Sequence, residues 1–409
     1  MSRIPVVVIG AGQAGLAVSN LLTGAGVDHV VLERGRTAQR WDSHSWQSLR
    51  LLTPNWLSRL PGYRYTGPEP AGFMSAAEVA GYLRCYAQGA PVVEGAEVES
   101  VSGCGDGYRV VTGAGSWSAS AVVVATGWCD LPRVPAVALD TRIEQLTPAT
   151  YRNPAALPDG GVLVVGASAS GVQLADELVG AGRTVVLAVG GHSRVPRRYR
   201  GLDIMWWLDA MGVLDQRLDE RRSPAEPSLQ LVGRSDGREV DLRSLQDRGV
   251  GLAGRLTGVD GSRLRFADDL AGTTRRADAR LVDLLRRVDA FAGAAGLAEE
   301  IEAASPVRGA RTTGAPSALD LRRAGIGTVI WATGYRRAYP WLHVPVLDRA
   351  GEIRHRGGAT AAPGLHVIGM RWQSRRNSAN LDGVRHDAVT VVCRVLEHLG
   401  AGSHLRGAA

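Results

Sequence analysis

Two glycine-rich turns in this sequence have the residue types and spacing to bind the phosphates of a dinucleotide. The first contains Gly10, Gly12 and Gly15, between a run of valine and isoleucine and a helical pattern. The first glycine allows a tight bend, the second lets the backbone approach a pyrophosphate, and the third packs the helix against the strand. Glu33 ends the next apolar run, where a carboxylate accepts hydrogen bonds from a ribose. The spacing therefore predicts a dinucleotide site at the N-terminus of a helix.

The second turn, at residues 162–171 (VLVVGASASG), differs from the first at its middle position. Gly166 and Gly171 keep the outer glycines, but Ser168 stands where the middle glycine is expected. The strand that follows has no acidic residue at its end. An acidic side chain there would repel the 2′-phosphate of NADPH, whereas an arginine binds a phosphate bidentately. This favours NADPH over NADH. The alternative is that the arginines here form a solvated loop; the candidate phosphate ligands are Arg194, Arg197 and Arg198.

The cysteines and histidines form no pattern typical of a metal site or a redox dithiol. No CxxC pair is present, and the four cysteines stand far apart, at Cys85, Cys104, Cys129 and Cys393. The histidines have no paired spacing of a metal site or a catalytic triad, so we expect no metal. Two dinucleotide sites without a dithiol favour hydride transfer from NADPH to a flavin, and onward to oxygen or a small molecule.

The elements that position the two turns repeat along the chain. Each turn lies in a strand–helix–strand pattern, and each pattern is followed later by an apolar strand that ends in Ala-Thr-Gly. Right-handed strand–helix–strand units build parallel sheets, so we expect an α/β fold of two Rossmann-like domains, the second inserted into the first. The expected limits are 1–155 and 336–409 for the first domain and 156–335 for the second, with a substrate-shaping insert at about 200–310.

A cluster of large apolar residues, Met205, Trp206 and Trp207, lies within that insert. It could line an apolar passage for a substrate, but packing between the domains is the favoured interpretation. No motif in the insert identifies a substrate.

Composition and charge limit the partners of this 409-residue chain. Its net charge is +7, and all 47 basic residues are arginines spread along the chain, so nucleic-acid binding is disfavoured. No apolar run approaches the roughly 20 residues of a membrane span. An apolar strand close to the N-terminus leaves no room for a signal peptide. Together with the scattered cysteines, these features predict a cytoplasmic protein.

Several motifs, in the same order along the chain, make the sequence similar to one family of flavoproteins. They are GAGQAGLA, VVLERGRTAQRW, SLRLLTPNWLSRLPG, VVVATG, YRNPAALPDGGVLVVGASASG, VIWATGYRRAYPWL and GLHVIG. With them the chain resembles the class B flavoprotein monooxygenases, especially the shorter bacterial and YUCCA-like flavin-containing members. The resemblance implies that the first turn binds FAD and the second binds NADPH, with serine tolerated at the middle glycine of the second.

The resemblance also implies cofactor contacts at individual positions. For the FAD pyrophosphate and ribose they are Gly10, Gly12, Gln13, Ala14, Gly15, Glu33 and Arg34. Elsewhere around FAD they are Arg40 and Trp41 near the flavin, Val98 at the adenine, Thr126 and Gly127 in the first Ala-Thr-Gly, and Asn380 and Leu381 at the start of the last helix. For NADPH they are Gly166, Ser168, Ser170, Gly171, Arg194, Arg197 and Arg198.

The reaction that the resemblance implies is oxygenation of a small organic substrate by dioxygen through a flavin C4a-(hydro)peroxide. The oxidation would be of the N, S or Baeyer–Villiger type, with FAD and NADPH as cofactors. No side chain needs to act as a strong acid or base in this chemistry, so no catalytic residue is assigned. A homodimer is left open.

Three departures from the family pattern bear on the oxygenating step. The signature F-x-G-x-x-x-H-x-x-x-[WY] keeps only its final aromatic, since it aligns on Thr141, Ile143, Thr147 and Tyr151. Leu52 stands where the family has an asparagine near the flavin. Met370 stands where related reductases carry an acid, a lack that class B members share. Two alternatives therefore stay open: an NAD(P)H-dependent flavin reductase or oxidase that oxygenates no substrate, and a non-catalytic dinucleotide-sensing regulator.

Overall fold

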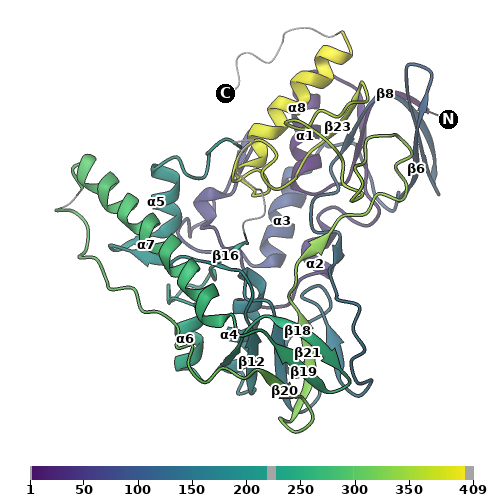
Figure 1. Cartoon of the computed structure of the whole chain (residues 1–409). Coiled ribbons are helices and arrows are strands. Elements are labelled where there is room, and N and C mark those ends of the chain that lie inside the picture. Colours follow the sequence, from purple (N-terminus) through teal and green to yellow (C-terminus); the bar gives the residue numbers. More distant parts are fainter. Residues whose placement is uncertain (1, 219–226, 298, 401–409) are drawn as a thin grey trace.

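The computed structural model describes residues 2–218, 227–297 and 299–400, which form two α/β units (Figure 1). The upper unit in this view is purple and yellow, because it takes its elements from both ends of the chain. The lower unit is teal and green and comes from the middle of the chain. The predicted fold class, two Rossmann-like units with one inserted into the other, is confirmed.

The first unit is built on a seven-stranded sheet of order β5-β2-β1-β8-β7-β6, in which β23 also pairs with β8. Its strands are β1 (Ser2–Ile9), β2 (His29–Leu32), β5 (Val92–Val93), β6 (Val98–Cys104), β7 (Gly107–Thr112), β8 (Gly115–Val124) and β23 (Leu365–Val367). β7 pairs antiparallel with both β6 and β8, whereas the remaining pairs are parallel. The long helices of this unit are α1 (Gln13–Gly24), α3 (Ala76–Tyr86) and α8 (Val384–His398).

The central strand β1 is apolar on both faces, as a buried parallel strand must be. Val6 and Val8 face a core shared with α1, α3 and α8, whereas Val7 faces a second core that includes β6, β7 and residues 339–353. None of these three valines has any exposed surface. The continuous apolar run in the sequence therefore reflects burial on both sides of the sheet.

The second unit has a five-stranded parallel sheet of order β10-β21-β11-β12-β17. Its strands are β10 (Glu144–Leu146), β11 (Gly161–Val165), β12 (Val185–Ala188), β17 (Gly251–Ala253) and β21 (Ile326–Trp331). β10 lies before residue 156, so this sheet takes a strand from the segment that was expected to belong to the first domain. One face is covered by α4 (Ala169–Gly180) and α6 (Leu242–Asp247), and the other by β18 (Leu256–Asp260), β19 (Arg263–Phe266) and β20 (Ala318–Asp320).

The chain crosses between the units twice, and the two crossings pair with each other. β9 (Leu131–Pro132) leaves the first unit and β22 (Tyr335–Arg336) returns to it, and they form an antiparallel ribbon. The backbone N–H of Arg133 donates to the carbonyl of Gly334 at 2.8 Å. The ribbon joins the ends of both Ala-Thr-Gly segments.

The insert contains α5 (Ile204–Ala210) and the 25-residue α7 (Leu270–Ala294). Trp207 is fully buried and its indole N–H donates to the carbonyl of Tyr199 at 2.9 Å, whereas Trp206 is 36% exposed. Leu57 of the first unit belongs to the same apolar core as Trp207, so this cluster packs between parts of the molecule. The remaining elements are α2 (Gln39–Ser43), η1 (Asn55–Leu57), η2 (Pro154–Ala156), β3 (Arg59–Leu60), β4 (Tyr63–Arg64), β13 (Ser193–Arg194), β14 (Arg198–Tyr199), β15 (Leu202–Asp203) and β16 (Leu229–Gln230).

A buried histidine in β23 predicts a pH dependence of stability. His366 is 6% exposed, and neither ring nitrogen has a hydrogen-bond partner among the described residues. Burial, helped by Arg394 and His398, lowers the pKa of His366 from 6.5 to about 4. Because the folded pKa lies below the unfolded one, this group favours the folded state above pH 6.5, and that contribution is lost as the pH falls towards 4.

We expect the free energy of unfolding to fall between pH 7 and pH 4.5, by about 2 kcal/mol from His366 alone. Urea unfolding of wild type and of His366→Leu at both pH values isolates the contribution of His366 to the free energy of unfolding, since the leucine variant keeps every other titrating group. His343→Leu, at an exposed histidine, is the matched control and should keep the wild-type slope. Equal slopes for wild type and His366→Leu would contradict the prediction.

Candidate functional site

The first glycine-rich turn, between β1 and α1, leaves room for a ligand at one position only. Gly10 has φ +107°, and a Cβ there would lie 2.8 Å from the carbonyl oxygen of Ala125. A Cβ at Gly15 would overlap the carbonyl oxygen of Gly10, whereas one at Gly12 would meet nothing within 4 Å. The outer glycines are therefore required by the protein's own backbone, and the middle one borders open space. This is the geometry that a pyrophosphate needs.

The N-terminus of α1 offers free backbone donors at that open space. Gly12 is the N-cap, and no side chain caps the first turn of the helix. Its N–H groups and the positive end of the helix dipole are thus available to an anion.

The Glu33 side chain, just after β2, is held in place by hydrogen bonds that include one from the first glycine-rich turn. Its carboxylate accepts from the backbone N–H of Ala11 at 2.8 Å and from that of Gly35 at 3.0 Å. A carboxylate has about four acceptor positions, so two remain for ribose hydroxyls. Val98, at the start of β6, lies two residues after Ala96, whose N–H donates to the carbonyl of Glu33 at 2.8 Å. The chain therefore passes close to Glu33 just before Val98, and the adenine contact of Val98 stays a prediction.

The far side of this site comes from the C-terminal return of the chain. Gln13 in α1 donates through its side-chain amide to the carbonyl of Ala379 at 2.9 Å. A Cβ at Gly369 would lie 3.1 Å from the Cβ of Ala14 and 3.8 Å from the Cα of Gly127. The start of α1, the first Ala-Thr-Gly and the segment before α8 therefore meet, which brings Asn380 and Leu381 to the site. Gly369 and Ala379 were not among the predicted site residues, although Gly369 ends the GLHVIG motif.

Arg34, Arg40 and Trp41 lie at the entrance from β2 into α2. The Arg34 guanidinium is 3.6 Å from the carboxylate of Asp130, and the Arg40 guanidinium lies 5.2 Å from the ring centre of Tyr335 in β22. Trp41 packs against the core that contains α1. Arg40 is thus placed at the ribbon between the two units, with Tyr335 as a neighbour that the sequence did not reveal.

The second turn, between β11 and α4, repeats this geometry with serine at the middle position. Gly166 has φ +108°, and a Cβ there would overlap the carbonyl oxygen of Ala332, while one at Gly171 would overlap that of Gly166. Ser168 has φ −83° and ψ −169°, and Gly12 has φ −84° and ψ −175°. Any residue adopts this extended conformation without strain. Serine is therefore compatible with the turn.

The side chains of Ser168 and Ser170 lie at the free end of α4. Ser168 is the N-cap, but its hydroxyl caps no backbone N–H of the helix, and Ser170 is in the first turn. The open backbone donors and the adjacent hydroxyls fit a phosphate.

The two Ala-Thr-Gly motifs have a structural role in these turns. Ala125 follows β8 and Ala332 follows β21, and the carbonyl of each lies against the first glycine of its turn. A larger residue than glycine at Gly10 or Gly166 would collide with that carbonyl. This contact is the physical reason why strand–turn–helix and strand–Ala-Thr-Gly occur together twice.

The three arginines predicted at the 2′-phosphate lie in different surroundings. The guanidinium of Arg194 is buried and donates to the carboxylates of Asp241 and Asp278. Arg197 is also buried; it donates to the carbonyl of Leu52 at 2.8 Å and pairs with Asp203. These internal partners already engage both groups. Arg198 is exposed and donates to the carbonyl of Gly201. Of the three arginines, it is therefore the one at the surface, and its binding of the 2′-phosphate stays a prediction.

The positions that depart from the family signature have ordinary structural partners. The hydroxyl of Thr147 lies 3.3 Å from that of Thr150, in a turn that leads to Tyr151. Tyr151 is fully buried and its hydroxyl donates to Glu177 of α4 at 3.2 Å. Burial raises the pKa of both Tyr151 and Glu177. The surviving aromatic therefore anchors the linker on the second unit.

Leu52 and Met370 are apolar residues at the two positions where an asparagine and an acid occur in related flavoproteins. Leu52 packs against the apolar core of the insert, and Met370 is buried with its sulfur 2.9 Å from a terminal nitrogen of Arg337. Asn55 lies close in sequence to Leu52, but its side chain is occupied by the carbonyl of Glu69 and the N–H of Met74. No asparagine replaces the family's residue from that segment.

The insert is tied to the segment before α8 by backbone hydrogen bonds. The N–H of Leu218 donates to the carbonyl of Ser374 at 2.9 Å, and that of Asn377 donates to the carbonyl of Leu214 at 3.1 Å. The insert thus lies against the segment that also approaches the first turn.

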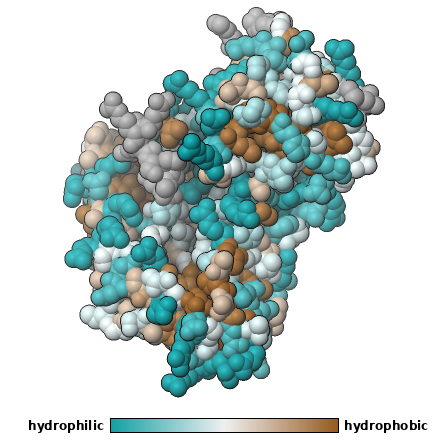
Figure 2. Space-filling view, turned by 45° about the vertical axis from the view of Figure 1, so that its right-hand side comes forward, coloured by the Kyte–Doolittle hydropathy of each residue, from teal (hydrophilic) through white to brown (hydrophobic). Residues whose placement is uncertain are grey.

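Among the described residues, no helix combines the length and the apolar character needed to cross a bilayer. Figure 2 shows a largely hydrophilic face, on which hydrophobic residues gather in two separate areas, one in the upper and one in the lower half.

Comparison with known proteins agrees with this geometry. Residues 7–211 match the family described as pyridine nucleotide-disulphide oxidoreductase. An "uncharacterized oxidoreductase CzcO-like" of Geobacillus kaustophilus is 30% identical over 97% of this chain and 99% of its own length. A probable indole-3-pyruvate monooxygenase of Arabidopsis thaliana, YUCCA4, is 31% identical over 42% of this chain and 43% of its own length. The solved structure of a flavin-containing monooxygenase from Stenotrophomonas maltophilia covers 98% of this chain and 100% of its own, with TM-score 0.68 and 22% identity.

Proposed function

Because the chain belongs to the pyridine nucleotide-disulphide oxidoreductase family, and within it to the flavoproteins of the class B monooxygenase kind that use FAD and NADPH, we propose that it oxygenates a small organic substrate. The proposed reaction is an N-, S- or Baeyer–Villiger-type oxidation that consumes NADPH and dioxygen. When bound, FAD supplies the hydride-accepting and oxygen-reducing chemistry that protein side chains lack.

The observation that carries the proposal is the pair of matching glycine turns in a chain without a redox dithiol. Gly12 and Ser168 each leave the N-terminus of a helix open, so one turn fits FAD and the other fits NADPH. The four cysteines are all free thiols. Cys129 follows the first Ala-Thr-Gly, and burial raises its pKa to about 12, which keeps the thiol protonated and unreactive. Electrons that enter at the second turn therefore have no cysteine pair to reduce.

In the proposed site, the chain's own residues bind and orient the two nucleotides. The N-terminus of α1 and Glu33 hold the pyrophosphate and ribose of FAD, and the N-terminus of α4 with Ser168 and Ser170 holds the pyrophosphate of NADPH. Arg198 is our proposed ligand for the 2′-phosphate. The apolar insert, which contacts the segment before α8, excludes water and shapes the substrate pocket.

A second candidate function is an NADPH-dependent flavin oxidase that releases hydrogen peroxide. Leu52 and Thr147 favour it, because the asparagine and histidine that the family places there are absent and the side chain of the nearby Asn55 is already engaged by Glu69 and Met74.

Turnover under ¹⁸O₂ separates the two functions. The purified, FAD-loaded protein is given NADPH with a panel of amines, sulfides and ketones, and products are read by mass spectrometry while peroxide is measured in parallel. We expect one compound class to gain a single ¹⁸O atom and to lower the peroxide formed per NADPH. Stoichiometric peroxide with every compound would favour the oxidase, and a flavin that NADPH never reduces would contradict both enzymes.

A further inference from the structure

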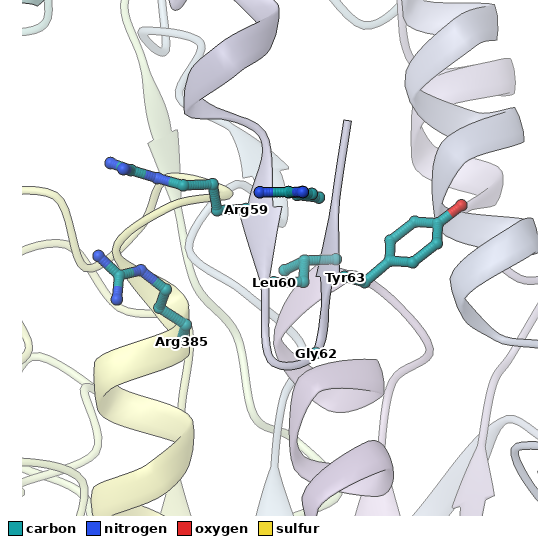
Figure 3. Close-up of a pocket in the computed structure, with 6 residues that line it drawn as sticks. Arg59, Leu60, Gly62, Tyr63 and Arg385 are labelled. Carbon is teal, nitrogen blue, oxygen red and sulfur yellow. The ribbon is translucent and has the colours of Figure 1, made fainter. Parts of the chain in front are cut away.

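A pocket lies between the hairpin β3–β4 and the first turn of α8. Its volume is about 360 Å³, and Figure 3 shows the side chains of Arg59 and Arg385 extending from these two elements towards the same side. The lining residues are Arg59, Leu60, Gly62, Tyr63, Arg64 and Arg385. Half of them are arginines.

The hairpin places two of these arginines directly opposite each other. Pro61 and Gly62 form its two-residue turn, and Gly62 has φ +66°, which suits the third position of a type II turn. Arg59 and Arg64 are Cα partners across the two strands, so their side chains lie on the same face. Like charges in this arrangement repel each other unless an anion compensates them.

The carboxylates nearby compensate only part of this charge. Asp382 has a buried side chain and accepts from Nε of Arg59 at 2.6 Å and from Nε of Arg385 at 3.1 Å. Asp209 lies 3.3 Å from a terminal nitrogen of Arg59. Arg64 has no carboxylate within ion-pair distance in the part of the chain that the structure describes. Three guanidinium groups thus face two carboxylates, and the terminal N–H groups of Arg64 and Arg385 remain.

The pocket is separate from both dinucleotide turns. A Cβ at Gly62 would lie 4.0 Å from the side-chain oxygen of Asn20, in the middle of α1, about two helical turns from the open N-terminus of that helix. Asp382 nevertheless links the pocket to the first site, because it also accepts from the side chain of Asn377 at 3.1 Å. Asn377 belongs to the segment that carries Ala379, the partner of Gln13.

We propose that this pocket binds a small oxyanion, a carboxylate or a phosphate group, on Arg59, Arg64 and Arg385. Such an anion completes the charge balance of the hairpin, because guanidinium groups donate in pairs to the oxygens of either group. Because Asp382 also holds the side chain of Asn377, binding of the anion steadies the segment that carries Ala379.

Calorimetric titration of the FAD-loaded protein tests the proposal without turnover. Saturating NADP⁺ blocks the second turn, and sodium phosphate or sodium succinate is added against sodium chloride of equal ionic strength. We expect saturable binding of at least one of them, about tenfold weaker in Arg64→Gln, since a charge-assisted pair is lost. Binding of phosphate alone would assign a phosphate ligand, and binding of succinate alone a carboxylate.

Arg109→Gln is the matched control, because Arg109 is also an exposed arginine in an antiparallel strand of the first unit. It should bind like the wild type. Saturable binding that is equal in wild type and Arg64→Gln, or no saturable binding of either anion, would overturn the proposal. Neither result depends on whether the protein oxygenates a substrate.

Discussion

A Gly15→Ala protein is expected to purify with little FAD. The added methyl group would overlap the carbonyl oxygen of Gly10 and lie 3.3 Å from the side chain of Ala125. Both neighbours belong to the junction of β1, β8 and α1, so the turn must open to admit the methyl group. Opening moves the N–H groups of α1 away from the pyrophosphate. We expect the flavin bound per protein, measured by absorbance after heat release, to fall about tenfold or more.

Gly24→Ala provides the control within the same helix. Gly24 is the last residue of α1, and a Cβ there would meet nothing within 4 Å. This variant should keep wild-type flavin content and be at least as stable, because alanine narrows the unfolded ensemble. A full complement of FAD in Gly15→Ala would show that the first turn does not hold the pyrophosphate.

The second large effect is expected at Gly171, where alanine should separate FAD binding from reduction by NADPH. The methyl group would overlap the carbonyl oxygen of Gly166, within the second turn. The first turn is untouched, so the protein should remain yellow. We expect the rate of anaerobic flavin reduction at a fixed low NADPH concentration, followed by stopped-flow absorbance, to fall about 100-fold. Reduction by dithionite should be unchanged, since it needs no nucleotide site.

Gly180→Ala is the control in α4. A Cβ there would approach only the end of the flexible Arg248 side chain, at 3.1 Å. Reduction by NADPH should therefore stay near the wild-type rate. If Gly171→Ala were also reduced at that rate, the second turn could not be the NADPH site.

The local parts of the site could be predicted from the sequence because their causes are local. The strain at Gly10 and the collision at Gly15 arise within one turn, so their spacing alone indicates them. The middle position could not be resolved in this way. Only the backbone angles of Ser168 show that serine costs no strain there, since they match those of Gly12.

The surroundings of the arginines could not be predicted from the sequence. Arg194 follows β12 closely, which suggested a phosphate ligand, but its partners Asp241 and Asp278 come from later elements that a one-dimensional pattern does not place beside it. The same limit applies to Gly369 and Ala379. They reach the first turn because β23 and α8 return to a sheet begun more than 300 residues earlier, and tertiary contact of that kind leaves no periodicity in the sequence.

This return of the chain sets an order of assembly during synthesis. The sheet of the second unit is continuous from β10 to β21 and is complete once residue 331 has left the ribosome. The first unit still lacks β23 and α8 at that moment, and the Gln13–Ala379 contact spans 366 positions. Since domains fold as units when their segments are available, we expect the nascent chain to complete the turn between β11 and α4 first and the surroundings of the turn between β1 and α1 last. Until α8 docks, the side chains of α1 that pack against α8 stay exposed to solvent.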